Sequence, residues 1–142
     1  MCEKILVVCL GNICRSPLGE RLLQKLLPEK TVRSAGISAV LDWEAHPTMQ
    51  AVAAENGLSL AHHKPQQLSA ALIDEYDLIL VMEDWQRQRA LEWQPLAAAK
   101  IQLFDRRPVP DPYGYGVPVY RDVYAQMASA AARWAAQLGG RG

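Results

Sequence analysis

The N-terminal part of the chain places a buried-strand pattern directly before a tight polar turn and a helix. Lys4–Cys9 is short and rich in Val, Ile and Leu, as expected of a parallel strand buried on both faces. Gly11 and Asn12 follow, and these residue types tolerate the left-handed backbone that a tight turn requires. Apolar residues then recur at helical spacing over 17–27. This order favours an α/β fold with a ligand site where the strand ends.

Three further short apolar segments predict the rest of a sheet, at 31–34, 77–82 and 100–104. Helices are predicted at 17–27, 47–56 and 120–138, with Ser16 as the N-cap of the first helix and Pro17 as its first residue. A chain of 142 residues, half of them apolar, suits one ordinary domain with a substantial core. We therefore expect one domain over 1–142, an α/β sandwich with a four-stranded, mainly parallel sheet flanked by helices.

Charge and hydropathy exclude several classes of partner. Fifteen Lys and Arg residues balance fifteen Asp and Glu residues, so no broad attraction for nucleic acid or anionic lipid is expected. The longest strongly apolar run, 5–10, is far shorter than the roughly 18 residues that cross a bilayer, and also shorter than a signal-peptide core. Three cysteines, an odd number, favour a reducing compartment. We expect a cytoplasmic protein without membrane insertion.

The loop between the first strand and the first helix, residues 9–16 and called the anion loop below, has the composition of a phosphate site. Its backbone N–H groups and the helix N-terminus can surround an oxyanion, and Arg15 adds a planar fork that holds two phosphoryl oxygens. The same groups, with the Ser16 hydroxyl, would favour thiolate over thiol at Cys9. The loop therefore predicts an anion cradle with Cys9 as its nucleophile.

The anion loop, Val8-Cys9-Leu10-Gly11-Asn12-Ile13-Cys14-Arg15-Ser16-Pro17 with its flanking residues, resembles that of the low-molecular-weight protein tyrosine phosphatases, in which Cys, five residues, Arg and Ser or Thr follow in order. Further similarities lie at 34–36, 77–83 and 111–113, so the resemblance covers essentially the whole chain. It looks closest to bacterial members that act beside autophosphorylating tyrosine kinases of capsule and exopolysaccharide export. Such a kinase, or another phosphotyrosine protein, is the implied partner.

The resemblance implies hydrolysis of phosphotyrosine through a phosphocysteine on Cys9, with Arg15 binding phosphate and Asp111 as general acid and base. It implies no cofactor and no metal, and the three histidines lack metal-ligand spacing with the cysteines. The remaining residues expected to bind substrate are Leu10, Gly11, Asn12, Ile13, Cys14, Ser16, Trp43 and Tyr113.

Residues 108–114 carry Asp111 in a proline-rich stretch that cannot form a helix or a central strand. A stiff loop is suited to hold one carboxyl group over a cavity, where it protonates a departing phenolate. Tyr113 can stack on the aromatic group of the substrate. The segment therefore fits the role that the resemblance gives it.

Two positions depart from the family pattern, and a third lies in a loop that varies among relatives. His63 is followed three residues later by Gln66 where the family usually has Arg, so a supporting contact is expected to be missing. His46 stands before Pro47 where many members have Asp. Trp43 lies in a variable loop that supplies an aromatic wall in relatives.

The same residues bear on three other functions. Arsenate reduction on this fold uses two further cysteines late in the chain, and none follows Cys14 here. Relatives specialised for phosphoarginine carry Thr where Ile13 stands. A non-catalytic redox or phosphate-binding module would not need Asp111 and Tyr113. Cys14 itself remains open between a packing residue and a redox partner of Cys9. A phosphotyrosine phosphatase is thus the preferred hypothesis.

Overall fold

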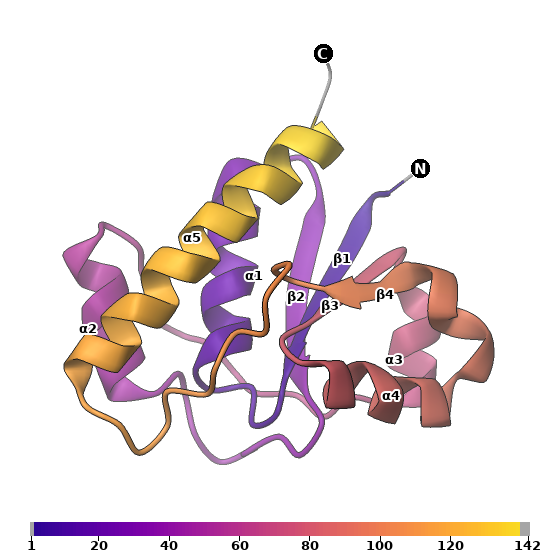
Figure 1. Cartoon of the computed structure of the whole chain (residues 1–142), viewed down its shortest axis with the longest axis horizontal. Coiled ribbons are helices and arrows are strands. Elements are labelled where there is room, and N and C mark those ends of the chain that lie inside the picture. Colours follow the sequence, from indigo (N-terminus) through magenta and orange to yellow (C-terminus); the bar gives the residue numbers. More distant parts are fainter. Residues whose placement is uncertain (1, 140–142) are drawn as a thin grey trace.

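A four-stranded sheet forms the centre of the molecule, and the computed structural model describes residues 2–139. The strands β1 (Lys4–Cys9), β2 (Thr31–Gly36), β3 (Leu78–Val81) and β4 (Ile101–Leu103) lie in the order β2-β1-β3-β4 (Figure 1). Every pairing between them is parallel. The prediction of a small α/β domain with four strands is confirmed, and the carboxyl ends of the strands meet at one edge of the sheet.

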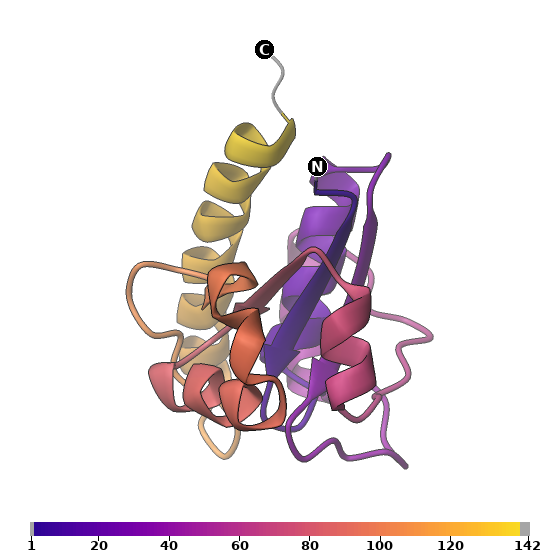
Figure 2. The same cartoon turned by 90° about the vertical axis from the view of Figure 1, so that its right-hand side faces the viewer.

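Helices cover both faces of this sheet. α1 (Arg15–Leu26), α2 (Pro47–Glu55) and α5 (Val117–Gly139) lie on one side, and α3 (Ala70–Glu75) and α4 (Asp84–Trp93) lie on the other (Figures 1 and 2). A 3-10 turn, Pro95–Lys100, leads into β4. Because consecutive strand residues point to opposite faces, β1 contributes to two separate cores. Ile5, Val7 and Cys9 pack toward α1 and α5, whereas Leu6 and Val8 pack toward α3 and α4.

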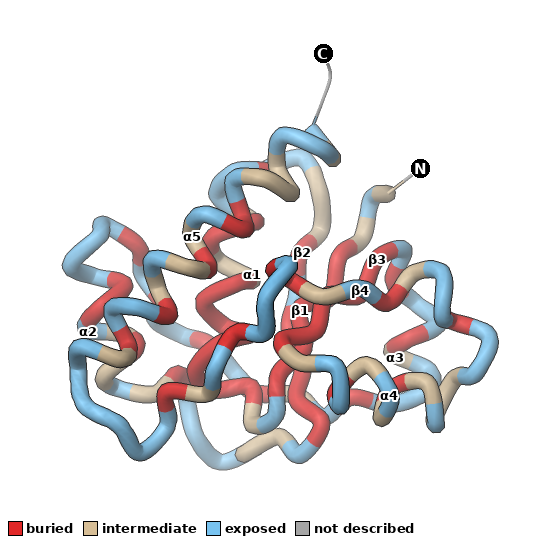
Figure 3. The backbone as a smooth tube through the Cα atoms, viewed as in Figure 1, coloured by how far each residue is buried: buried red, intermediate tan, exposed pale blue. Residues whose placement is uncertain are grey.

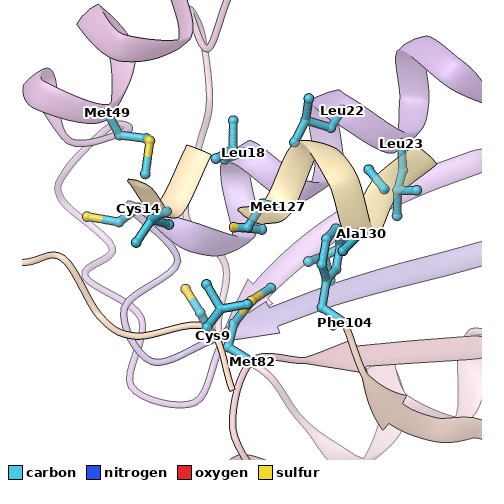
Figure 4. Close-up of a cluster of buried hydrophobic side chains, with 14 of the residues drawn as sticks. Cys9, Cys14, Leu18, Leu22, Leu23, Met49, Met82, Phe104, Met127 and Ala130 are labelled. Carbon is cyan, nitrogen blue, oxygen red and sulfur yellow. The ribbon is translucent and has the colours of Figure 1, made fainter. Parts of the chain in front are cut away.

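Because a core lies on each face of the sheet, the strands are apolar at consecutive positions and not only at every second one. Residues 5–9 of β1 are all buried, as are all four residues of β3 (Figure 3). On the α1 side, Phe104 and Met127 fill the space above β1 together with Leu18 and Leu23 (Figure 4). The first strand is thereby held on both faces, and the position of its last residue, Cys9, is fixed by the core.

Several predicted boundaries differ from those observed. α1 begins at Arg15 rather than at Pro17, and Cys14 is its N-cap, so the prediction of Ser16 as the N-cap is wrong. The Ser16 hydroxyl contacts Cys9 and Asn12 rather than a backbone N–H of the helix. α5 begins at Val117, three residues before the predicted start. α3 was not predicted, because six residues are too few to show a helical period.

Between residues 2 and 139, no helix combines the length and the apolar composition that a membrane span requires.

Candidate active site

The backbone of the anion loop is fixed by hydrogen bonds to its carbonyl groups. Five consecutive carbonyls, those of residues 9–13, each accept a hydrogen bond from outside the loop. Their donors, in order, are the N–H groups of Ile37 (3.0 Å), Ser38 (2.8 Å) and Val40 (3.0 Å), Nε2 of His63 (2.7 Å) and the N–H of His46 (2.7 Å). Among the described residues, the N–H groups of 10–14 have no protein acceptor. The loop therefore turns its carbonyls outward and leaves its N–H groups available for an anion.

Asn12 supports the loop from beneath. Its backbone is left-handed, with φ of 59°, and its side chain is fully buried. The amide nitrogen donates to the hydroxyls of Ser16 (2.7 Å) and Ser34 (2.9 Å), and the amide oxygen accepts from the Gln66 N–H (2.9 Å). The turn is consequently tied to the end of β2.

Gly36 allows this close approach. A Cβ atom at Gly36 would lie 2.7 Å from the Leu10 carbonyl oxygen and 3.0 Å from the Asn12 nitrogen. Both neighbours are backbone atoms that cannot move aside independently. Only glycine fits where β2 meets the anion loop.

The thiol of Cys9 lies at the centre of the loop and contacts Ser16 twice. The Sγ atom is 3.0 Å from the Ser16 Oγ and accepts from the Ser16 N–H at 3.4 Å. Because the Ser16 hydroxyl already accepts from Asn12, its own proton can be donated, and the Cys9 sulfur at 3.0 Å is a nearer acceptor than the Ala35 carbonyl at 3.4 Å. This arrangement stabilises a negative charge on Cys9.

Arg15 is buried beside the thiol, with only 2% of its side chain exposed. Nη1 donates to Glu83 (2.9 Å) and to the Val109 carbonyl (2.8 Å), and Nη2 lies 3.6 Å from Asp111 Oδ2. The Nε–H is buried without a partner among the described residues. An unpaired N–H on a buried cation is costly unless an anion accepts from it, so the guanidinium is suited to bind phosphate.

The cavity above the loop collects most of the predicted site residues. It has a volume of about 560 Å³, and its wall is formed by Cys9, Leu10, Gly11, Ile13, Cys14, Arg15, Ser38, Val40, Trp43, Asp111 and Tyr113. Trp43 and Tyr113 are about half exposed, so their rings form the rim. Asn12 and Ser16 lie beneath the loop and are absent from this wall. A larger groove of about 990 Å³ lies between β4 and α5, and its lining includes Arg133 and Asp105, which are paired with each other.

The thiol of Cys14 contacts α5 as well as lining the cavity. Its Sγ is 3.9 Å from the Tyr120 hydroxyl, and Met49 packs in the same core (Figure 4). Burial, with a smaller effect from the neighbouring Cys9, raises the pKa of the Cys14 thiol to about 12. A pKa this high favours the protonated thiol of Cys14 at neutral pH.

Gln66 stands where the family usually has Arg. Its side chain donates to the Ser34 carbonyl at 2.9 Å, and its backbone N–H donates to the Asn12 side chain at 2.9 Å. Gln66 thus braces both β2 and the loop with contacts of its own, and the loss of the contact made by Arg stays a prediction. His63 also contacts the loop, through the Asn12 carbonyl.

Other supporting residues were missed by sequence reasoning. Glu83, at the start of α4, and the Val109 carbonyl both orient Arg15, and Ser34 holds Asn12. Glu83 lies within a segment that resembled the family, yet only the structure shows its contact across the sheet. No local pattern predicts a partner 68 residues away.

Comparisons with known proteins agree with this geometry. A family model described as "Low molecular weight phosphotyrosine protein phosphatase" matches residues 4–141. The low molecular weight protein-tyrosine-phosphatase Wzb of Escherichia coli (strain K12) is 44% identical over 142 residues, which covers 97% of each chain.

Two solved structures are similar over nearly the whole chain. Wzb of Vibrio vulnificus in complex with benzylphosphonate has a TM-score of 0.94 and 43% identity, covering 96% of this chain and 99% of that one. Wzb of Escherichia coli K30 in complex with sulphate has a TM-score of 0.95 and 42% identity, covering 98% and 100%. The chain belongs to the low molecular weight phosphotyrosine protein phosphatase family.

Proposed function

We propose that this protein hydrolyses phosphotyrosine in two steps through a phosphocysteine. The Cys9 thiolate attacks phosphorus, the bond to the tyrosine oxygen breaks, and Asp111 gives its proton to the departing phenolate. Asp111 then takes a proton from a water molecule that attacks phosphorus, which releases phosphate and restores the thiolate. Arg15 and the loop N–H groups hold the phosphoryl oxygens throughout both steps.

One observation carries the proposal: a thiol, a buried guanidinium and a carboxylate converge on one cavity from different parts of the chain. Cys9 accepts hydrogen bonds from Ser16, Arg15 has an unpartnered Nε–H, and Asp111 lies 3.6 Å from Arg15 at the cavity mouth. Nucleophile, anion site and proton donor are the three parts that displacement at a phosphate ester needs.

The walls of the cavity favour an aryl phosphate. Ile13 and Val40 supply apolar surface, and the Trp43 and Tyr113 rings flank the mouth. An apolar wall at Ile13 offers no hydrogen bond to a guanidinium, which supports phosphotyrosine over phosphoarginine. The Vibrio vulnificus relative was solved with benzylphosphonate, in which an aromatic ring is joined to a phosphonate through one carbon.

The physiological substrate in this proposal is a bacterial phosphotyrosine protein, and an autophosphorylating tyrosine kinase of polysaccharide export is the preferred candidate. The resemblance to bacterial members of that kind supports it. Such a partner and a nucleophilic thiol both suit the cytoplasm, where cysteines stay reduced. All three cysteines are free thiols in the structure.

The test is the hydrolysis of aryl phosphates by the unmodified chain and by Cys9→Ser. The variant is expected to bind phosphate, seen as a rise in melting temperature, and to lose turnover, because a serine hydroxyl is not an anionic nucleophile at neutral pH. Cys2→Ser, a change away from the cavity, is the matched control and should retain full activity. Turnover above about 1% of the unmodified rate in Cys9→Ser would contradict the mechanism.

Selectivity is measured with phosphotyrosine, phosphoserine and phosphoarginine under the same conditions. Phosphotyrosine is expected to have the highest kcat/KM. Equal values for phosphoarginine would overturn the argument from Ile13.

A further inference from the structure

His46 lies behind the aromatic side of the cavity and contacts four segments at once. It is the N-cap residue of α2, and its backbone N–H donates to the Ile13 carbonyl of the anion loop at 2.7 Å. Its ring stacks on Tyr120 of α5, with centroids 5.4 Å apart, and meets Tyr113 edge-on at 5.5 Å. The Trp43 ring is 6.5 Å away.

The cap contact requires a particular form of the imidazole. Nδ1 accepts a hydrogen bond from the Thr48 N–H at 3.2 Å, so this nitrogen carries no proton. The Tyr120 hydroxyl lies 3.5 Å from the same nitrogen. Protonation would turn Nδ1 into a donor facing the Thr48 N–H, and would place a positive charge at the positive end of a helix. The arrangement therefore belongs to neutral His46.

The ring also supports both aromatic groups at the cavity rim. Tyr113 is half exposed, and among the described residues its one aromatic neighbour is the His46 imidazole. Trp43 is likewise half exposed, and its nearest ring is His46. A change in the orientation of His46 would therefore also shift these two rings, on which the aromatic ring of a substrate stacks.

We propose that His46 is a positioning residue, which holds the Tyr113 and Trp43 rings for the substrate aryl group only while its imidazole is neutral. The affinity for aryl phosphates then falls in mildly acidic solution, whereas phosphate binding by the anion loop does not depend on the imidazole. This inference rests on the proposed function, because it concerns how the same cavity binds its substrate.

The ionisable groups around His46 include two whose pKa is raised by burial and three carboxyl groups. Burial raises the pKa of the Tyr120 hydroxyl well above its usual value and that of Cys14 to about 12, so both stay neutral. Tyr113 and Asp111 face the cavity, and the carboxylates of Asp42 and Glu44 line a hollow beside His46. Burial lowers the pKa of His46 from 6.5, which agrees with a neutral cap at pH 7.

Two substitutions distinguish the hydrogen bond that His46 accepts as N-cap from the packing of its ring. His46→Asn keeps an oxygen acceptor for the Thr48 N–H and has no charge at any pH, whereas His46→Phe keeps a ring against Tyr113 and removes the acceptor. His62→Asn is the control, since His62 is exposed and its φ of 66° is one that Asn tolerates. KM and kcat for an aryl phosphate, and the inhibition constant of inorganic phosphate, are measured from pH 7.5 to 5.

The expected result is that KM, and no other measured constant, changes differently with pH in the unmodified chain and in His46→Asn. Between pH 7.5 and 5, KM of the unmodified chain should rise about threefold relative to His46→Asn, the size expected from loss of one cap interaction. The other groups of the site are the same in both proteins, so the ratio of the two KM values isolates the effect of His46. The inhibition constant of phosphate should stay equal in the two proteins, and His62→Asn should follow the unmodified chain.

His46→Phe adds a direct check on the cap. It should melt at a lower temperature than His46→Asn at pH 7.5, and its KM relative to His46→Asn should not change with pH. Proton NMR of the imidazole should show His46 titrating over the pH range in which KM diverges.

A ratio of KM values that is constant with pH would overturn the role of His46, as would a parallel change in the inhibition constant of phosphate. In either case, aryl phosphate hydrolysis at pH 7.5 by the unmodified chain would leave the proposed function intact. Absence of that hydrolysis would instead count against the proposed function.

Discussion

The Ser16 hydroxyl lies 3.0 Å from the Cys9 sulfur, although Ser16 belongs to the first turn of α1 and Cys9 is the last residue of β1. The strand and the helix therefore meet at the atom that performs the chemistry. A hydroxyl proton directed at sulfur stabilises the thiolate both as the attacking group and as the leaving group when phosphocysteine is hydrolysed.

Ser16→Ala should therefore lower kcat by about tenfold or more, while KM for an aryl phosphate changes little. The second step should be affected most, because the thiolate leaves with less stabilisation. Rapid-quench kinetics would show this as a larger burst of phenol relative to the steady rate. Ser38→Ala, which removes an exposed hydroxyl from the same cavity, should leave the burst unchanged.

Asp111→Asn should impair substrates in proportion to the basicity of their leaving group. An amide cannot donate the proton that a phenolate of pKa about 10 needs, whereas nitrophenolate departs without it. The variant should thus lose more kcat on phosphotyrosine than on nitrophenyl phosphate, with typical losses of about 10²- to 10⁴-fold. If the loss were the same for a series of phenols, Asp111 would act through its contact with Arg15 instead.

Gly36→Ala should disturb the anion loop and the stability together. The added methyl group would meet the backbone of Leu10 and Asn12 at 2.7 and 3.0 Å, so the loop has to shift. Overpacking of this kind costs about 1–3 kcal/mol of stability, and kcat/KM should also fall because the N–H groups move.

Gly116→Ala provides the comparison for this change, because its added methyl group would have no neighbour closer than 3.6 Å. Thermal melts and aryl phosphate kinetics of both variants test the argument. Unchanged activity in Gly36→Ala would mean that the loop tolerates movement at its base.

Cys14 should react slowly with an oxidised Cys9 at neutral pH. Peroxide converts the Cys9 thiolate to a sulfenic acid, and attack by a Cys14 thiolate would form the disulfide and release hydroxide, which becomes water on protonation. Since the pKa of Cys14 is raised to about 12, its thiolate fraction rises about tenfold for each pH unit from 7 to 9. Disulfide formation should accelerate with pH in the same proportion.

Mass spectrometry of the loop peptide after brief exposure to peroxide measures this rate, with Cys14→Ser as the control. A rate equal at pH 7 and pH 9 would show that oxidation first releases Cys14 from Tyr120.

The parts of the structure that could be predicted are those that local physical chemistry determines. The apolar runs gave the strands, and Gly11 and Asn12 indicated the turn, where Asn12 indeed has a positive φ. The start of α1 was placed too late because Ser16 has the properties of an N-cap, and only the neighbouring thiol explains its other role.

The remaining parts depend on contacts between distant segments. Glu83 and Val109 reach Arg15 from 68 and 94 residues away. His46 meets Tyr120 because α5 packs beside α2, and it meets Tyr113 in the segment before α5. A sequence pattern carries no direct sign of such pairs. Such pairs follow from the arrangement of the layers of the fold, which has to be known before the pairs can be predicted.

The carbonyls of the anion loop are held outward by the rest of the domain, so the loop cannot bind an anion in the same way without that domain. Their donors come from residues between 37 and 63, and Glu83 and Asp111 add further support from beyond that stretch. A peptide carrying only residues 9–16, or a graft of them into another turn, would have no means of keeping its N–H groups turned inward. The short sequence pattern therefore identifies the site reliably, but it would not form the site in another protein, because contacts from the whole domain hold its conformation.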